Sequence, residues 1–445
     1  MRADQHRRLQ YLFITLSGAI YIFLSYFAQR YNSVPLIFSF AVLFFFYWYI
    51  YQKTIIKWKQ LILVSLLFRL LLLFSVPNLS DDIYRFIWDG KLLGEDIHPF
   101  AHLPSWFVNN DRLPESWDLS LYNKLNSPDY FTIYPPFAQL VFWLSAYSDS
   151  IIGSAVIIRL LIIGAEVVSI FFLAKLCESY NIPKKQVLLY ALHPLVILEL
   201  TSNLHLEAFM IAFFVLGIYF CKARKPISAG VVLALAVAAK LIPLILLPAF
   251  LRRLSFKKLV LLFLSVLVFL IILFWPLYEP ALVKGMTESI SLYFQKFEFN
   301  ASIYYLVREI GFYVKGYNII GVAGPWLSMI TFMLIIAIAL LADPKKVSTP
   351  SVWLWILFVY FAFATIVHPW YATSLVALSV LTTFRFPVVW SGLIFLSYLG
   401  YSETGYQENM LVVILEYGLL YIFIVYELYY AFSKRDFFKK KKLLK

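Results

Sequence analysis

The run LVLLFLSVLVFLIILFW occupies residues 259–275 and holds seventeen residues without one charged side chain. An α-helix needs roughly 17–25 apolar residues to cross the ~30 Å hydrocarbon core of a bilayer. Comparable runs recur along the chain from Tyr11 to Phe432. A water-soluble fold would have to hide all of them from water, so the pattern predicts a protein that crosses a membrane many times.

The composition of the whole chain supports this prediction. Hydrophobic residues make up 62% of the sequence and aromatic residues 19%, whereas charged residues make up only 14%. Soluble domains are about half apolar. The charged residues also collect between the long apolar runs instead of alternating along them. Both features argue against a soluble protein with buried core helices.

The net charge of +13 is concentrated in short basic clusters between apolar runs. Lys and Arg are retained on the cytoplasmic side of membrane proteins. We therefore interpret the charge as a topology signal rather than as affinity for nucleic acid, and we expect both termini in the cytoplasm. The clusters lie at residues 2–8, 53–59, 184–185, 222–225, 252–258 and 345–346 and in a basic tail, 433–445.

The apolar runs predict a single all-α integral membrane domain over residues 1–445, with roughly 11–14 transmembrane helices. Two polar segments are expected on the outer side, a first loop at 77–133 and a second at 276–317. The expected spans are 11–28, 35–51, 61–76, 134–148, 152–176, 187–200, 204–221, 227–251, 259–275, 318–341, 352–367, 371–384, 387–400 and 410–432.

Two of these segments do not fit a simple count of crossings. Segments 134–148 and 152–176 both separate the outer loop from the next cytoplasmic cluster, so we expect the shorter one to dip in without crossing. Segment 227–251 lies between two cytoplasmic clusters and contains Lys240 and Pro243. We expect two half-helices there, meeting near the outer side. Broken helices at membrane depth require a protein or water-filled surrounding and often mark binding sites.

The first outer loop, 77–133, carries nine acidic residues against four Lys and Arg, a local balance of −5. It begins with SDDIYRFIWDG at residues 80–90, which predicts a short amphipathic helix with Ser80 as its N-cap. Asp81 and Asp82 precede Arg85 by four and three residues. This spacing suits an ion pair on an exposed helix. It equally suits a general base at the membrane face, where a carboxylate accepts a proton from a substrate hydroxyl.

The longer run SDDIYRFIWDGKLLGEDIHPF, residues 80–100, resembles the first outer loop of the GT-C glycosyltransferase superfamily. It is most similar to bacterial mannosyltransferases that use polyprenyl-phosphate mannose, and more distantly to the catalytic subunit of the GPI mannosyltransferase. The resemblance implies a GT-C type helix bundle in which an acidic residue or pair of this loop is the catalytic centre. Gly94 to Phe100 resembles the family's G-x-N-P-Y turn, with Ile97-His98-Pro99-Phe100 as a variant.

Further blocks match the same superfamily in order and extend the resemblance over roughly residues 60–375. Two departures occur near residue 200, where His193 replaces an Asn and Glu207 an Asp of the family pattern. The matching blocks are Thr132 to Pro136 (TIYPP), His193-Pro194 with Glu199, Asn203, His205 and Glu207, Ala239 to Pro243 (AKLIP), Phe299 to Ser302 (FNAS) and His368 to Tyr371 (HPWY).

The resemblance assigns roles to residues of these blocks. It implies that Asp81 and Asp82 are catalytic, with Asp81 favoured as the base, and that Lys240 and Arg85 meet the donor phosphate. The substrate contacts it implies are Trp88, Asp89, Tyr134, His205, Glu207, Asn300, His368, Trp370 and Tyr371.

The residues alone leave several alternatives open. Lys240 lies deep in an apolar stretch and is expected to contact phosphate, to snorkel, or to pair with a carboxylate. His205 and Glu207 point to different helix faces, which favours separate polar contacts over a metal pair. His368 suits either an interface anchor or a substrate contact. Arg159 and Glu166 are seven residues apart on one helix face and predict an interior polar contact.

The resemblance implies an inverting transfer of a sugar, mannose by analogy, from a polyprenyl-phosphate donor to a lipid-linked or polymeric acceptor. The expected place is the outer, periplasmic face of a bacterial plasma membrane. No cofactor is expected, and a divalent cation is not favoured because the acidic loop offers no dedicated cage of oxygen ligands. Two alternatives use the same architecture, namely a flippase or transporter of polyprenol-linked glycans and a ligase of lipid-linked glycans.

Overall fold

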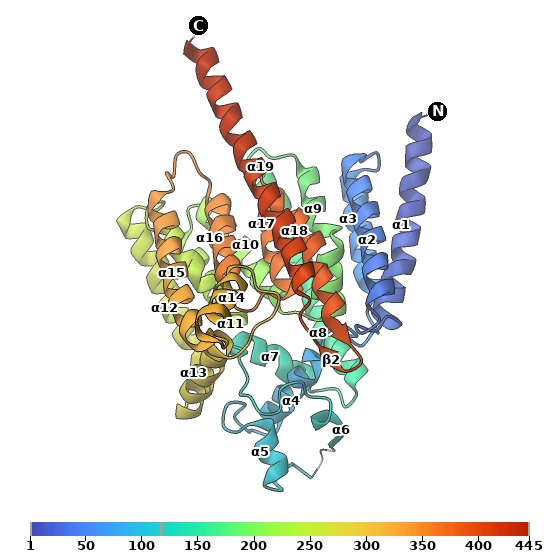
Figure 1. Ribbon diagram of the computed structural model, residues 1–445, viewed down its shortest axis with the longest axis vertical. Helices are drawn as coiled ribbons and strands as arrows, with labels where there is room; N and C mark the ends of the chain where they lie inside the picture. Colours follow the sequence, from blue (N-terminus) through green and yellow to red (C-terminus); the bar gives the residue numbers. More distant parts are fainter. Residues whose placement is uncertain (1, 116, 118, 444–445) are drawn as a thin grey trace.

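The computed structural model describes residues 2–115, 117 and 119–443 (Figure 1). Nearly all of the regular structure is helical, and the described part contains a single two-stranded hairpin. The first half of the chain forms α1 (Arg2–Tyr26), α2 (Ser33–Gln52), α3 (Trp58–Leu71), α4 (Asp82–Gly94), α5 (Pro104–Asn109), α6 (Leu119–Tyr122), α7 (Pro136–Ser145), α8 (Ile151–Ser179), η1 (Lys184–Val187), α9 (Leu188–Ala191), η2 (Val196–Ser202) and α10 (Glu207–Lys222).

The second half of the chain continues the bundle and adds the hairpin near its end. Its elements are α11 (Pro226–Ala239), η3 (Ile242–Phe250), α12 (Phe256–Phe274), η4 (Trp275–Leu277), α13 (Pro280–Gln295), α14 (Ile303–Lys315), α15 (Ile320–Leu341), α16 (Thr349–Phe363), η5 (Pro369–Tyr371), α17 (Ala372–Ser379), α18 (Phe386–Leu393), η6 (Ile394–Gly400), β1 (Tyr401–Ser402), β2 (Gly405–Tyr406) and α19 (Met410–Leu443).

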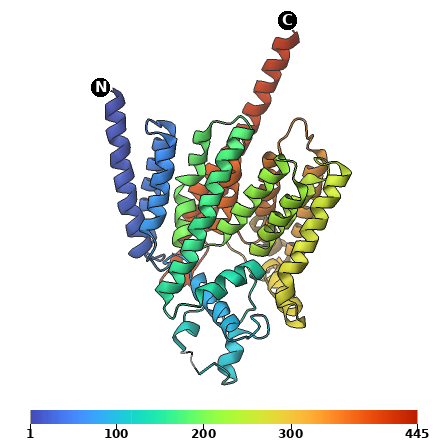
Figure 2. The same ribbon diagram turned by 180° about the vertical axis from the view of Figure 1, so that it is seen from behind.

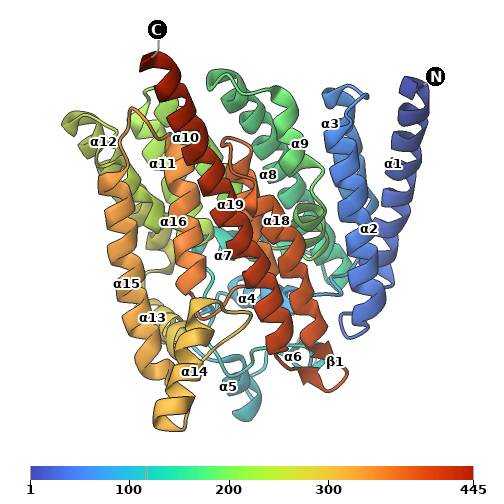
Figure 3. The same cartoon turned by 45° about the horizontal axis from the view of Figure 1, so that its top comes forward.

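The helices run roughly side by side, with both termini at one end of the bundle and α4 to α7 at the other (Figure 1). Seen from behind, the long α8 lies on the near face and runs along the length of the bundle (Figure 2). Figure 3 shows α19 beside α18, with α1 and α2 at one edge and α12 and α15 at the opposite edge. The predicted all-α polytopic membrane fold is confirmed. The last residues of the predicted basic tail, 444–445, lie outside the described residues.

The number of full-length spans differs from the prediction. Within the described residues, six helices are long and apolar enough to cross a membrane, or seven if η2 and α10, bent by 114°, form one broken span. Several expected spans are instead short or interrupted, because polar side chains and prolines stop the helices. The six are Asp4–Tyr26, Ser33–Gln52, Ile151–Ser179, Phe256–Leu277, Ile320–Leu341 and Met410–Ala431.

Segments 134–148 and 227–251, which did not fit the count of crossings, contain a short helix and a broken helix, as predicted. Helix α7 has ten residues, which at 1.5 Å per residue covers only about 15 Å and cannot cross the membrane. The run 227–251 breaks where expected. There α11 ends at Ala239, Lys240 is extended with φ −159° and ψ 138°, and η3 follows.

An ion pair buried in the bundle corrects the expected partnership of Arg159 with Glu166. Glu166 accepts hydrogen bonds from Arg69, from Nε at 2.5 Å and from Nη2 at 2.9 Å. Arg159 instead donates to the backbone carbonyls of Thr201 at 2.8 Å and Ser202 at 3.0 Å. Both residues are interior, as predicted, but each has a partner on another element that the chain's own spacing does not reveal.

The outer loop packs onto the bundle through a close contact between α4 and α7. A Cβ atom at Gly90 would lie 2.1 Å from the backbone carbonyl oxygen of Phe142, so only glycine allows the two helices to approach this closely. The ring of Phe86 stacks on that of Phe142 at 4.4 Å. This contact fixes the start of α4 over the end of the bundle.

Candidate active site

The acidic pair lies at the first turn of α4. Asp81 occupies the N-cap position and Asp82 is the first helical residue. Ser80, the expected N-cap, lies one residue earlier, and its Oγ accepts a hydrogen bond from the backbone N–H of Asp82 at 3.3 Å. Successive helical residues point about 100° apart, so the two carboxylates face different surroundings.

Asp81 forms an ion pair that the sequence did not predict. Its Oδ2 lies 2.5 Å from Nη2 of Arg30, and each side chain is 33% exposed. Arg30 belongs to the connection between α1 and α2, and its guanidinium lies 5.2 Å from the ring centroid of Tyr401. Burial raises the pKa of Tyr401 to about 12, with Arg30 lowering it and Asp82 and Asp81 raising it. The Asp81 carboxylate is thus held by a cation.

Asp82 faces the bundle instead. Its Oδ1 accepts a hydrogen bond from Nδ2 of Asn126 at 3.1 Å, and its Oδ2 accepts one from the hydroxyl of Tyr134 at 3.4 Å. Nδ1 of His205 lies 4.0 Å from the same Oδ2. The side chain keeps 23% of its surface exposed. Asp82 is therefore both supported by the protein and open to a ligand.

Glu199 lies within η2, and His205 lies in the break between η2 and α10. Element η2 is a π-helix, a form that often marks functional positions, and Leu204 adopts a left-handed φ of 63° just before His205. Nε2 of His205 lies 3.4 Å from Oε2 of Glu199. Glu199 is fully buried and accepts hydrogen bonds from the hydroxyl of Tyr398 at 2.9 Å and from Nδ2 of Asn203 at 3.1 Å.

Trp370 lies between two imidazole rings. His205 stacks on its indole at 3.7 Å, and His368 stacks on it at 4.3 Å. His368 lies in the connection between α16 and η5, where burial lowers its pKa to about 3, with further lowering from His205 and Lys240. His368 is therefore neutral, and the stack holds three predicted site residues together.

Lys240 pairs with a carboxylate, which is one of the three alternatives that the sequence left open. Its Nζ contacts Oε1 of Glu207, and the Glu207 side chain is 1% exposed. The ammonium group also lies 4.8 Å from the ring centroid of Tyr371. Lys240 is thus paired with a carboxylate at the helix break between α11 and η3, and its side chain remains 23% exposed.

Several polar atoms of this cluster have no hydrogen-bond partner among the described residues. Buried polar groups are almost always satisfied in native proteins, by protein, water or a ligand. Unpaired atoms at one place therefore indicate a site that a polar ligand or water completes. These atoms are Oδ1 of Asn203, Nε2 of His205, Oε2 of Glu207 and Nδ1 of His368.

Three residues of the predicted set lie inside the outer loop rather than in this cluster. Arg85 is buried and donates to Asp89 at 2.8 Å and to the backbone carbonyl of Tyr130 at 2.9 Å. Asp89 also accepts a hydrogen bond from Gln139 at 3.2 Å. Trp88 is fully buried and packs its ring at 5.0 Å on Trp117. These contacts hold the loop together, so the structure does not bring these three residues to the cluster.

Asn300 is also placed apart from the cluster. It is fully buried, and its side chain donates to Oε1 of Glu416 at 3.3 Å. Its backbone N–H donates to Glu408 at 2.8 Å. The preceding Phe299 connects this segment to the site, because its ring lies 4.5 Å from that of His368.

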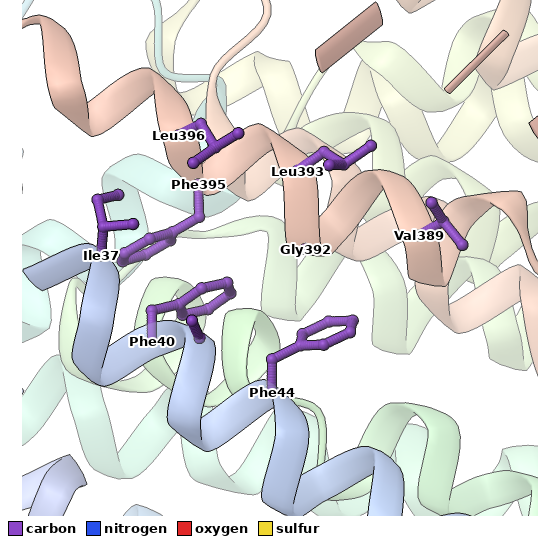
Figure 4. A pocket seen from close by; sticks show the side chains of 9 residues that line it. Ile37, Phe40, Phe44, Val389, Gly392, Leu393, Phe395 and Leu396 are labelled. Atoms are coloured by element: carbon purple, nitrogen blue, oxygen red, sulfur yellow. The ribbon is translucent and has the colours of Figure 1, made fainter. Parts of the chain in front are cut away.

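An apolar groove opens between α2 and the α18–η6 segment (Figure 4). Its volume is about 350 Å³. Phe40 and Phe395 stack at 3.7 Å along it, and Gly392 faces the ring of Phe44 (Figure 4). Outside the groove, Arg30 precedes α2 and Tyr401 follows η6, and these two residues contact each other.

The site offers no evident metal centre. Within residues 2–115, 117 and 119–443, no group of three or more His, Cys, Asp or Glu side chains is arranged to hold a metal ion. Its acidic residues are each matched with a cation, an amide, a hydroxyl or an imidazole. The arrangement suits proton transfer and the binding of an anion.

Fold and site together define a polytopic membrane protein whose carboxylates, imidazoles and aromatic rings gather beneath one polar loop. The chain belongs to the alpha-(1->6)-mannopyranosyltransferase family, because the model of the family's N-terminal domain matches residues 15–254, more than half of the chain. A comparison with the curated proteins finds no match. The predicted mannosyltransferase resemblance is confirmed. The match spans the segments that carry Asp82, His205 and Lys240, whereas Trp370 lies beyond it.

Sequence reasoning missed four residues of the cluster, namely Arg30, Asn126, Tyr398 and Tyr401. Glu199 was seen in a motif but was given no role. Arg30 carried one usable signal, because it is a single cation on the predicted outer side between two apolar runs. The other three are ordinary polar residues whose significance comes only from their contacts.

Proposed function

We propose that the protein transfers mannose from a polyprenyl-phosphate donor to a hydroxyl of a glycolipid or glycan acceptor, with inversion at the anomeric carbon. The observation that carries this proposal is Asp82, a partly exposed carboxylate contacted by Asn126 and Tyr134 from the connection between α6 and α7 and by His205 from the break before α10. A general base of this kind must be fixed in place and still reach its substrate.

In the proposed step, Asp82 accepts the proton of the acceptor hydroxyl as its oxygen attacks the anomeric carbon. The bond between that carbon and the phosphate oxygen breaks, and the polyprenyl phosphate leaves with both electrons of the bond. Phosphate is a good leaving group, so no general acid is required. A single displacement inverts the configuration, so an α-linked product requires a β-linked donor.

Asp82 serves as the base in preference to Asp81, the residue favoured on resemblance alone. The Asp81 carboxylate is held by Arg30 at 2.5 Å, and a carboxylate engaged by a guanidinium is less available to take a proton. Among the described residues, the polar side chains in contact with Asp82 are the amide of Asn126, the hydroxyl of Tyr134 and the imidazole of His205. Arg30 then neutralises the second carboxylate beside the base.

Lys240 supplies the positive charge that the leaving phosphate needs as negative charge develops on it. It is partly exposed and lies next to Glu207 and Tyr371 at the end of α11. Arg85 does not share this role, because its donors already serve the outer loop. Trp370 offers the sugar an aromatic face beside His205.

The apolar groove supports a lipid-linked substrate. Its lining is apolar and comes from α2, α18 and η6, elements that the chain connects directly to Arg30 and Tyr401. An isoprenoid chain in this groove would place its anionic head at the cluster. The basic segments of the sequence support cytoplasmic termini. With the termini in the cytoplasm, the site at the opposite end of the bundle would face the outer side of the plasma membrane.

The test is transfer by the purified protein in proteoliposomes with β-mannosyl polyprenyl phosphate and a mannose-containing glycolipid. The expected result is one new α-linked mannose, read from the anomeric proton signal of the product. Movement of the donor across the bilayer without a new linkage would instead favour a flippase, and transfer of a whole preassembled glycan would favour a ligase.

A further inference from the structure

Glu199 is a buried carboxylate that the proposed mechanism leaves without a task. Its side chain is fully buried. No Lys or Arg nitrogen of the described residues lies within 4.0 Å of it, and its partners are the hydroxyl of Tyr398, the amide of Asn203 and the imidazole of His205. Burying a charge without a cation is costly. A carboxylate that stays buried despite this cost is expected to have a function.

His205 connects Glu199 to the base. Its two ring nitrogens face two different carboxylates, with Nε2 at 3.4 Å from Oε2 of Glu199 and Nδ1 at 4.0 Å from Oδ2 of Asp82. The ring cannot turn freely, because Trp370 stacks on it at 3.7 Å. The left-handed backbone of Leu204 sets its direction. The contacts to both carboxylates are longer than good hydrogen bonds, so a small shift on substrate binding would complete them.

We infer that Glu199 is a positioning residue that acts through His205 on the base Asp82. This inference rests on the proposed function. Once such a shift closes the 3.4 Å contact, Glu199 accepts the Nε2–H of His205, which selects the tautomer with a lone pair on Nδ1 facing Asp82. In other proton-transfer sites too, a carboxylate that accepts one ring N–H of an imidazole selects its tautomer.

The proton then has a defined route. The acceptor O–H bond breaks and an O–H bond forms on Asp82, after which the proton passes to Nδ1 of His205 and the Asp82 carboxylate is restored. The resulting imidazolium lies between two carboxylates, and Glu199 stabilises it. After the product leaves, the proton returns through Asp82 to water, since Asp82 is 23% exposed. No other reactant is needed.

Other ionisable groups lie near Glu199, His205 and Asp82 and contribute to any pH profile. Asp81 adjoins Asp82 in the sequence, and His368 lies across Trp370 from His205. Tyr134 contacts Asp82, Tyr398 contacts Glu199, and Tyr401 interacts electrostatically with both carboxylates. Arg30 pairs with Asp81 beside Tyr401, and Lys240, paired with Glu207, interacts with His368.

The decisive experiment compares Glu199→Gln and Tyr398→Phe with the wild type in proteoliposomes. Glu199→Gln removes the charge that stabilises the imidazolium, so kcat is expected to fall about 100-fold, the usual share of acid–base assistance, while KM for the donor is unchanged. The acidic limb of the kcat profile is expected to move to lower pH. Tyr398→Phe removes a donor to Glu199, strengthens its hold on His205, and is expected to move the limb to higher pH.

Glu416→Gln is the matched control. Glu416 is equally buried, but it accepts hydrogen bonds from Trp390 and Asn300. Its loss is expected to leave the acidic limb where the wild type has it, even if the variant is less stable. Limb shifts of opposite sign in the two test variants cannot arise from general destabilisation.

The outcomes also separate this inference from the proposed function. If Asp82→Asn is inactive while Glu199→Gln and Tyr398→Phe keep the wild-type limb, the positioning role is wrong and the base assignment stands. If Asp82→Asn retains full activity, both are wrong. If both limbs move in the expected opposite directions, Glu199 acts on the base through His205.

Discussion

Replacing Lys240 by methionine is expected to reduce stability and activity for two separate reasons. The change leaves Glu207, 1% exposed, without its cation, and breaking a buried ion pair from one side costs about 3–5 kcal/mol. It also removes the charge proposed to meet the leaving phosphate. Loss of one such stabilising group lowers kcat by about 10²–10³-fold.

The double variant Lys240→Met/Glu207→Gln separates the two effects. Neutral side chains of similar volume replace both charges, and such replacements are often close to neutral for stability. The melting temperature is therefore expected to return near that of the wild type, whereas the loss in kcat persists. Thermal unfolding in detergent and single-turnover transfer in proteoliposomes measure the two quantities independently.

One result would refute this reasoning. A double variant that is stable and transfers mannose at the wild-type rate would show that Lys240 serves only to neutralise Glu207. Recovery of activity together with stability would mean that the charge is structural, and the leaving phosphate would have to meet another cation.

Three further predictions follow from other parts of the site. Gly392→Leu fills the apolar groove at Phe44 and is expected to raise KM for long-chain donors but not for ten-carbon ones; Gly164→Leu, at an open helix position, is expected to change neither. Arg30→Gln is expected to alter the melting temperature little, since a pair one-third exposed contributes below about 1 kcal/mol, yet to slow transfer by leaving Asp81 charged beside the base. Chelation of divalent cations is expected to leave kcat unchanged. A fall in kcat on chelation that is reversed by adding Mg²⁺ or Mn²⁺ would contradict a metal-independent mechanism.

The membrane fold and the interruptions in its helices were predictable because they depend on local composition. The ten-residue α7 and the break at Lys240 follow from segment length, charge clusters and a proline within a few residues. The gathering of His205, His368 and Trp370 followed only from the resemblance. Their mutual stacking could not be predicted, because it joins the break after η2 to the segment before α17.

The direction in which each side chain points could not be predicted from the sequence. The ion pair considered between Arg85 and the acidic pair does not form, because Arg85 pairs with Asp89 one helical turn further on. This pair turns into the loop, where Gln139 and Tyr130 contact it. The pairing of Arg30 with Asp81 joins residues about fifty positions apart, and no periodicity reports such a contact. Because spacing along one helix does not show partners on other helices, Arg159 was predicted to contact Glu166. The partner of Glu166 is instead Arg69.

The central claim is that Asp82 is the base and that Asp81 is held by Arg30. Single-turnover transfer by Asp81→Asn and Asp82→Asn, each with matched expression and melting temperature, tests this claim most directly. The account predicts a loss of about 10²–10⁴-fold for Asp82→Asn, the usual range for removing a general base, and a clearly smaller loss for Asp81→Asn. Full activity in Asp82→Asn, or a larger loss in Asp81→Asn, would contradict it.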